Sequence, residues 1–252
     1  MPAYRSVSFK SKWVKTKWLL ADEALEEYVP WTLPFTAANL AKILSRHSTV
    51  YFKPTGGTGG RRIIRIARQG EQYTTKLRHT TRKHAGAEAL QAYLSKKAAS
   101  EPYLLQQEIP LVTVKGKPFD IRVMVQKTSE GAWTSTALFM KIGKSGSVAT
   151  NYNQGGKIGF FEPTLEDAGF RDDEIRRIRT ELEELGESVG ALFDRHKSGF
   201  RELGLDVALD NRGLLWILEV NTRPQFYPLK KMSDRTLYRK IVSYAEQYGR
   251  KK

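Results

Sequence analysis

Apolar residues along the chain recur with two different periods, which separate strand-like from helix-like stretches. In FDIRVMVQ, residues 119–126, the odd-numbered positions are apolar and alternate with Asp120, Arg122, Met124 and Gln126, which predicts a half-buried strand. Residues 171–196 instead repeat apolar side chains at helical spacing, which predicts a long amphipathic helix. The stripe consists of Ile175, Ile178, Leu182, Leu185, Val189 and Leu192.

The same reading along the chain predicts two groups of elements. The first comprises a helix over 36–47 behind a Thr cap, a strand over 50–53, strands in RRIIRIAR and EQYTTKLR, a helix over 84–98 and a strand over 103–106. The second comprises LVTV, the strand at 119–126, a strand over 133–142, the long helix, a hairpin over 203–221 and a basic helix from about residue 234. We therefore predict an α+β fold of two lobes with a cleft between them. The expected divisions are 1–35, a segment packing on the core, then 36–109 and 110–252.

The composition narrows the function classes. The 252 residues include no cysteine, which excludes disulfides, thiolate metal sites and cysteine catalysis. The N-terminus lacks the apolar region of a secretory signal, and no stretch approaches the roughly 20 apolar residues of a membrane span. We therefore predict a soluble cytoplasmic protein.

Positive charge is concentrated in the first part of the chain. The net charge is +15, and residues 1–100 hold 18 Lys and Arg against 6 Asp and Glu. Such a field indicates an anionic partner, for which nucleic acid, a nucleotide, an acidic peptide and an anionic surface are all candidates.

The hairpin carries the strongest chemical signal. Strand alternation places Leu215, Ile217, Glu219 and Asn221 on one face, with Asp206 expected opposite Ile217 and diagonal to Glu219. Two carboxylates and an amide oxygen suit a hard cation such as Mg²⁺. A solvated pair of carboxylates is the alternative, but an unpaired carboxylate is costly in so apolar a run. The sequence therefore predicts a magnesium site at Asp206, Glu219 and Asn221.

A glycine-rich tip follows the strand at 50–53. Its residues Gly56, Gly57, Thr58, Gly59 and Gly60 would let backbone N–H groups approach phosphate oxygens, and Lys53 would add a cation. The pattern matches neither a Walker loop nor a dinucleotide fingerprint. A flexible hairpin without a ligand is the alternative.

Weaker signals lie on the second group of elements. Arg122 would bind phosphate through its guanidinium fork, or would form a structural pair with Asp120. The polar turn from Asn151 to Gly156 is typical of a loop and would line a cleft only in the company of the other motifs. The histidines lack paired metal spacing and are assigned no role.

Taken in order, the glycine-rich flap, QQEI, FDIRV, the Asn-to-GG turn, GLD and LEVN resemble the ATP-grasp superfamily, and especially its YheC/YheD family associated with spore coats. The likeness spans residues 11–228 and includes Ser11-Lys12-Trp13. It implies an ATP-grasp fold with ATP and Mg²⁺ as cofactors, and it makes spore association an added expectation. It also implies site residues: Lys12, Lys53 and the Gly56–Gly60 backbone on the nucleotide, Gln106, Gln107, Glu108 and Ile109 as the adenine hinge, Arg122, Lys141 and Asn151 facing the triphosphate, and Asp206, Glu219 and Asn221 as magnesium ligands.

The chain departs from this family in two side chains and in its layout. Relatives usually have arginine where Lys141 stands and glycine where Arg62 stands. ATP-grasp ligases also usually carry a substrate-binding region before the flap, which here follows about 50 residues. We therefore expect an acceptor site that is open or is completed by a partner chain.

These features lead to three hypotheses. The first is a carboxylate-amine ligase that forms a peptide-type bond on an amino acid or peptide through an acyl phosphate. The second is a kinase on the same scaffold. The third is a non-catalytic nucleotide-binding or coat protein, or a nucleic-acid binder, of which the last is the least expected.

Overall fold

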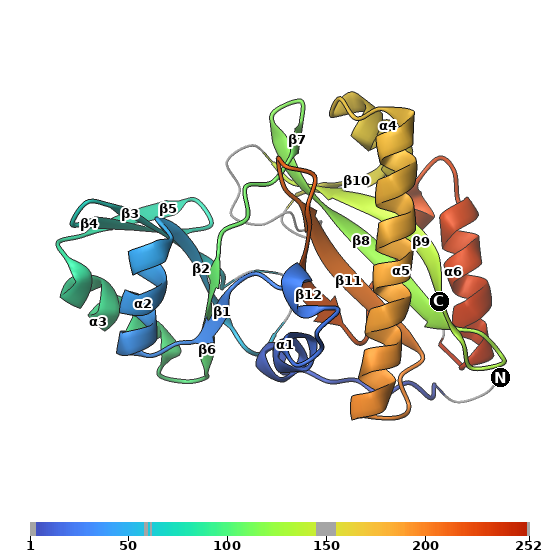
Figure 1. The fold of residues 1–252 in the computed structure, drawn as a ribbon, viewed down its shortest axis with the longest axis horizontal. Coiled ribbons are helices and arrows are strands. Elements are labelled where there is room, and N and C mark those ends of the chain that lie inside the picture. Colours follow the sequence, from blue (N-terminus) through green and yellow to red (C-terminus); the bar gives the residue numbers. More distant parts are fainter. Residues whose placement is uncertain (1–3, 58–59, 61, 145–154, 251–252) are drawn as a thin grey trace.

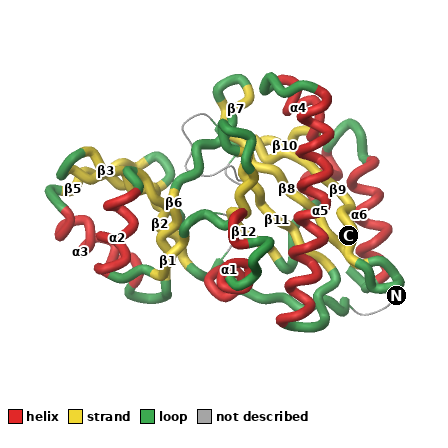
Figure 2. Tube along the Cα trace, in the orientation of Figure 1, coloured by secondary structure: helices red, strands yellow, loops and turns green. Residues whose placement is uncertain are grey.

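The computed structural model describes residues 4–57, 60, 62–144 and 155–250, and their strands form two sheets (Figure 1). Within this part of the chain, the strands of both sheets pair antiparallel. Helix α1 lies between the two sheets (Figure 2). The architecture agrees with the predicted α+β class.

The first sheet has the strand order β1-β6-β2-β3-β4-β5. Its strands are β1 (Thr32–Pro34), β2 (Thr49–Pro54), β3 (Ile64–Gln69), β4 (Gln72–Leu77), β5 (Thr80–His84) and β6 (Tyr103–Gln107), with helices α2 (Ala37–Arg46) and α3 (Ala87–Ala98). Leu40 and Ile43 of α2 and Leu90 and Leu94 of α3 pack against the buried side chains of this sheet. As predicted, Thr36 caps α2, because its hydroxyl accepts from the Asn39 N–H at 3.0 Å.

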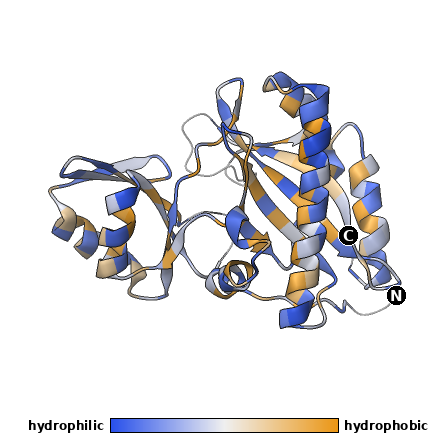
Figure 3. Ribbon diagram, in the orientation of Figure 1, coloured by the Kyte–Doolittle hydropathy of each residue, from blue (hydrophilic) through white to orange (hydrophobic). Residues whose placement is uncertain are grey.

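The second sheet has the strand order β10-β9-β8-β11-β12, with β7 pairing β8. Its elements are β7 (Thr113–Val114), β8 (Lys117–Lys127), β9 (Trp133–Ile142), β10 (Lys157–Phe160), α4 (Phe161–Asp167), α5 (Asp172–His196), β11 (Glu202–Leu209), β12 (Leu215–Asn221) and α6 (Thr236–Gln247). Odd and even positions of β8 face opposite sides as predicted, since Ile121 and Val123 join the core beneath α5 whereas Met124 joins the core beneath α6. The predicted half-buried state is wrong, because elements packed on both faces bury every residue from 119 to 126. Figure 3 shows hydrophilic and hydrophobic segments alternating along α5, as an amphipathic helix on a sheet requires.

The N-terminal part of the chain contributes to both lobes. Helix α1 (Lys12–Leu20) begins after Ser11, whose hydroxyl accepts from the Val14 N–H at 3.4 Å, and it contacts α5 and β12. Strand β1 instead pairs with β6 in the first sheet. A short 3-10 helix, η1 (Glu26–Tyr28), joins the two. The domain divisions at residues 35 and 109 stay predictions.

Among the described residues, no helix combines the length and the apolar character that crossing a membrane requires.

We predict that Gly190→Ala destabilises the protein, although alanine is the better helix former. A Cβ at residue 190 in α5 would lie 2.6 Å from the indole ring of Trp133, so the ring or the helix must shift. We expect the free energy of unfolding, measured by urea titration, to fall by about 1–3 kcal/mol. The control Ser95→Ala, on the exposed side of α3, should change it by less than about 0.5 kcal/mol. A Gly190→Ala variant more stable than the wild type would contradict this packing.

Candidate active site

A β-bulge in β12 decides which side chains of this strand face away from the core. Asp206 pairs directly with Glu219 and Val207 pairs with Ile217, so Leu218 is an extra residue on β12. The predicted register, with Asp206 opposite Ile217, is therefore wrong by two residues on β12. The predicted common face of Leu215, Ile217, Glu219 and Asn221 is wrong for the same reason.

The bulge shifts the strand alternation by one position. Leu215, Ile217 and Val220 belong to the buried core, whereas Glu219 and Asn221 are only partly buried. These two polar side chains thus lie on the side away from the core, next to Asp206. The three predicted magnesium ligands come together, and without placing Glu219 in the apolar interior.

The Asp206 carboxylate lies at the centre of a buried charge cluster. Its Oδ1 accepts from Arg122 at 2.7 Å and lies 3.0 Å from Lys141 Nζ, and its Oδ2 accepts from Asn221 Nδ2 at 3.3 Å. Burial would raise the pKa of Asp206, but Arg122 and Lys141 hold it well below its usual range. The carboxylate therefore stays ionised.

Asp120 pairs with Lys141 of β9. It lies 2.7 Å from Lys141 Nζ, whereas Arg122 pairs with Asp206, so the alternative of a structural Asp120–Arg122 pair is wrong. Burial raises the pKa of Asp120 to about 7, although Lys141 opposes the shift. Lys141 thus joins two carboxylates, and its own pKa is raised because their attraction outweighs its burial.

Three lysines contact β12 directly. Lys12 Nζ donates to the Gly57 carbonyl at 2.7 Å and lies 3.1 Å from Glu219, which joins the flap to the hairpin. Lys15 Nζ donates to the Val220 carbonyl at 2.5 Å. Lys53 Nζ donates to Gln106 at 2.7 Å and to the carbonyl of the bulge residue Leu218 at 3.1 Å.

These lysines line one small pocket, and their burial has an electrostatic cost. Its lining consists of Lys12, Lys15, Thr16, Leu19, Lys53, Ile217, Leu218, Glu219 and Val220. Burial lowers the pKa of Lys15 and of Lys53 to about 8, although Glu219 opposes the shift. Lys15 was not predicted from the sequence, because helix α1 was not predicted. In that helix Lys15 lies about one turn after Lys12.

The glycine-rich flap is only partly described. Thr58 and Gly59 lie outside the described residues, while Gly57 and Gly60 have positive φ angles of 80° and 66°, a conformation that favours glycine. Arg62 forms an ion pair with Glu101. This side chain is therefore held at the base of the flap.

The predicted adenine hinge lies at the end of β6 and just after it. Gln106 bonds Lys53 and donates to Thr32 at 2.9 Å, so it positions the flap lysine. The Gln107 N–H donates to the Trp31 carbonyl at 3.0 Å. Glu108 accepts from Arg65 at 2.6 and 3.0 Å and from Tyr51 at 3.2 Å, so its side chain is used within the first sheet.

Two predicted site residues remain, Ile109 and Asn151. Ile109 is buried, whereas Asn151 lies outside the described residues. The contacts described above link Lys12, Lys53, Arg122 and Lys141 to β11 or β12, whereas the Glu108 side chain bonds Arg65 and Tyr51 within the first sheet.

Cationic side chains outnumber carboxylates at this site, and a bound anion would balance the excess positive charge. Among the described residues, five cationic side chains face three carboxylates; they are Lys12, Lys15, Lys53, Arg122 and Lys141 against Asp120, Asp206 and Glu219. A polyphosphate fits this surplus.

The donor set also fits Mg²⁺. The described residues include no group of three or more His, Cys, Asp or Glu that would hold a metal by themselves. Two carboxylates and one amide, however, suit Mg²⁺, which keeps waters and takes phosphate oxygens as further ligands. Asp206, Glu219 and Asn221 are the residues that would hold it.

Comparison with known proteins places this site in a family. A family model described as YheC/D like ATP-grasp matches residues 3–251. The endospore coat-associated protein YheD of Bacillus subtilis (strain 168) is 27% identical over 224 residues, which cover 86% of this chain and 49% of YheD. The chain thus spans about half the length of this relative.

Solved structures share the fold. N5-carboxyaminoimidazole synthase from Aspergillus clavatus, in complex with ADP and 5-aminoimidazole ribonucleotide, matches 95% of this chain and 52% of its own, with 12% identity and a TM-score of 0.57. D-cycloserine synthetase DcsG matches 92% of this chain and 71% of its own, with 15% identity and a TM-score of 0.56. At these identities the likeness shows the fold, and it confirms the predicted ATP-grasp class.

We predict that ATP binding takes up protons above pH 8. Lys15 and Lys53 have pKa values of about 8 in the free protein, and adjacent phosphates would favour their charged forms and raise these values. Affinity should therefore fall as the pH rises above about 8. Calorimetry at pH 8.5 in two buffers of different ionisation enthalpy measures the uptake. Lys53→Arg, which stays charged, should reduce it, and proton release would contradict the prediction.

Proposed function

This chain belongs to the YheC/D-like ATP-grasp family, and on that premise we propose that it is an ATP-dependent carboxylate-amine ligase. Its substrate would be an amino acid or peptide whose carboxylate is activated as an acyl phosphate. ATP and Mg²⁺ would be its cofactors. The observation that supports this most strongly is the buried surplus of cations beside an Asp206, Glu219 and Asn221 oxygen cluster.

Each part of the site would have a distinct role. Lys53 and the flap backbone at Gly57 would contact phosphates, as would Lys12, which bonds that backbone. Arg122 and Lys141 would neutralise charge that develops on the transferred phosphoryl group. Bound magnesium would add Lewis-acid charge stabilisation, and Asp206 and Glu219 would orient it with Asn221.

The reaction would need no nucleophile from the protein. The substrate carboxylate attacks the γ-phosphorus, and the bond to the ADP oxygen breaks. An amine then attacks the acyl carbon, inorganic phosphate leaves, and the amine gives up a proton as the amide forms. The protein contributes orientation, charge neutralisation and exclusion of water beneath the flap.

A ligase asks less of the described carboxylates than a kinase does. Transfer to a hydroxyl is helped by a carboxylate placed to accept its proton, as in protein kinases. Asp206 and Glu219 are the proposed magnesium ligands, which leaves Asp120, paired with Lys141, for that role. A carboxylate acceptor is already ionised at neutral pH and needs no such base.

The acceptor side of the proposal rests on charge and on relatives. The basic first lobe suits an acceptor that carries carboxylates, such as an acidic amino acid or peptide. YheD is named as coat-associated, which supports a spore-related setting for this chain. A partner chain that completes the acceptor site, and a cytoplasmic location, stay predictions.

We expect ADP and phosphate to appear only when a carboxylate substrate and an amine are both supplied with Mg-ATP. Glu219→Gln should lower this turnover by about 100-fold or more, since it removes a charged magnesium ligand. The control Glu71→Gln changes an exposed carboxylate at the β3–β4 turn and should leave turnover intact. The assay combines coupled ADP detection with mass spectrometry of the products.

Three outcomes would overturn the ligase. Stoichiometric AMP would show adenylation instead of acyl phosphate formation. A stable phosphorylated acceptor that hydroxylamine does not trap would indicate the kinase. Absence of any nucleotide binding would favour a coat protein without catalysis.

A further inference from the structure

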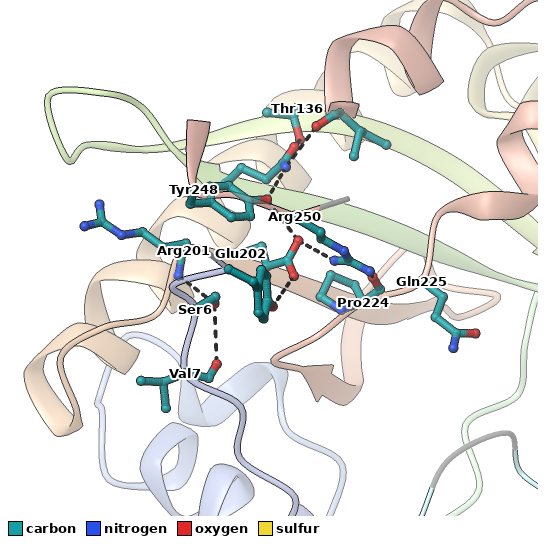
Figure 4. A network of polar contacts seen from close by, with 12 residues as sticks. Ser6, Val7, Thr136, Arg201, Glu202, Pro224, Gln225, Tyr248 and Arg250 are labelled. Atoms are coloured by element: carbon teal, nitrogen blue, oxygen red, sulfur yellow. Dashed lines mark hydrogen bonds and ion pairs between the residues drawn. The ribbon is translucent and has the colours of Figure 1, made fainter. Parts of the chain in front are cut away.

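A buried polar network connects the end of helix α6 to the segment that follows β12 (Figure 4). At its centre is Glu202, the first residue of β11, which is fully buried. Its carboxylate accepts from the Tyr4 hydroxyl at 2.8 Å and from the Tyr248 hydroxyl at 2.9 Å, and it forms an ion pair with Arg250. None of these residues belongs to the proposed catalytic set.

The network is extended on β8 and keeps its tyrosines protonated. Gln126, also fully buried, donates to the Tyr248 hydroxyl at 2.6 Å and accepts from Thr136 at 2.6 Å. Burial beside Glu202 raises the pKa of Tyr4 to about 12 and also raises that of Tyr248. Both hydroxyls therefore remain donors to Glu202 at physiological pH.

Arg250 carries the network to the candidate active site. Besides its ion pair with Glu202, its Nη2 donates to the Pro224 carbonyl at 2.6 Å, and its guanidinium lies 4.6 Å from the centre of the Phe226 ring. One planar fork thus holds a carboxylate, a carbonyl and an aromatic face together. An ammonium group has no such fixed fork.

The segment that Arg250 holds also contacts the phosphate-facing arginine. Arg122 Nη1 donates to the Gln225 carbonyl at 3.3 Å, one residue beyond Pro224. A Cβ at Gly204 would lie 2.5 Å from Pro224 and 3.2 Å from Arg122 Cδ, so both side chains pack closely on this glycine. The same segment directly follows Asn221, whose amide donates to Gly204 at 3.4 Å.

We infer that Arg250 is a positioning residue of the nucleotide site. Held by Glu202, it fixes the segment Thr222–Phe226, and this segment fixes Arg122 and the end of β12 that carries Asn221. The inference rests on the proposed function for its effect on ATP. Its structural step, from Arg250 to residues 222–226, does not depend on that function.

The test uses Arg250→Lys in the full chain. Removing the charge altogether would leave Glu202 buried and unpaired, and that variant is at risk of unfolding. Lysine keeps the charge opposite Glu202 but loses the fork that also reaches Pro224. The matched control is Lys127→Met, which removes a partly buried ion pair with Asp194 on the α5 side of the second sheet.

Two readouts separate positioning from a general loss of stability. Without nucleotide, Arg250→Lys should increase hydrogen exchange in peptides covering residues 220–228, whereas Lys127→Met should not. In titrations below the unfolding transition, Arg250→Lys should weaken Mg-ATP binding by about 2- to 30-fold, the range expected for residues that act through others. Lys127→Met should lower the melting temperature and leave affinity unchanged.

The outcomes are distinguishable. Unchanged exchange at residues 220–228 in Arg250→Lys would overturn the inference, whatever happens with nucleotide. Increased exchange with Mg-ATP affinity within 2-fold of wild type would also overturn it, since the segment would then not position the site. If the wild type fails to bind Mg-ATP, the proposed function fails, and the exchange experiment still decides whether Arg250 holds the segment.

Discussion

The bulge at Leu218 is the constraint on which the candidate site depends. A strand without it would keep Glu219 on the same side as Ile217, in the core beneath α5, where an ionised carboxylate is costly. With the extra residue, Val220 takes the core position and Glu219 pairs with Asp206 on the opposite side. The bulge residue also offers its carbonyl to Lys53, so the flap lysine is positioned by the same irregularity that positions the carboxylates.

The charges around this strand follow one electrostatic logic. Asp206 remains ionised in a buried place because Arg122 and Lys141 surround it, and these two cations in turn need Asp206 and Asp120. Among the residues that the structure describes, Lys15 and Lys53 form no ion pair with a carboxylate, and they bond backbone carbonyls instead. A carbonyl carries only a partial charge, so burial still lowers the pKa of Lys15 and Lys53. A bound anion would place a full negative charge beside these two lysines.

The sequence predicts well those elements whose pattern repeats over several residues. Three such predictions are the alternating faces of β8, the apolar stripe of α5 and the Thr36 cap of α2. Each depends on a short repeat or on a bond between near neighbours in the sequence, and the structure confirms all three. Helix α1 was missed because Lys12 and Lys15 are buried, so its inward face does not look apolar; their partners lie more than 40 residues away in the chain. The bulge was missed because it depends on pairing with β11, which residue spacing within β12 does not record.

Residues near both ends of the described chain contact the site. Local motifs therefore predict only part of it. Lys12 and Lys15 contact β12 and the flap from α1, while Thr222, just beyond β12, exchanges hydrogen bonds with the backbone of Phe9. Arg250 holds the same stretch from the other end of the sequence through Pro224. The LEVN motif supplies the oxygen donors, but segments more than 200 residues apart fix where they point. Geometry that is assembled from such distant parts changes when any one of them is lost, even where the motif itself is intact.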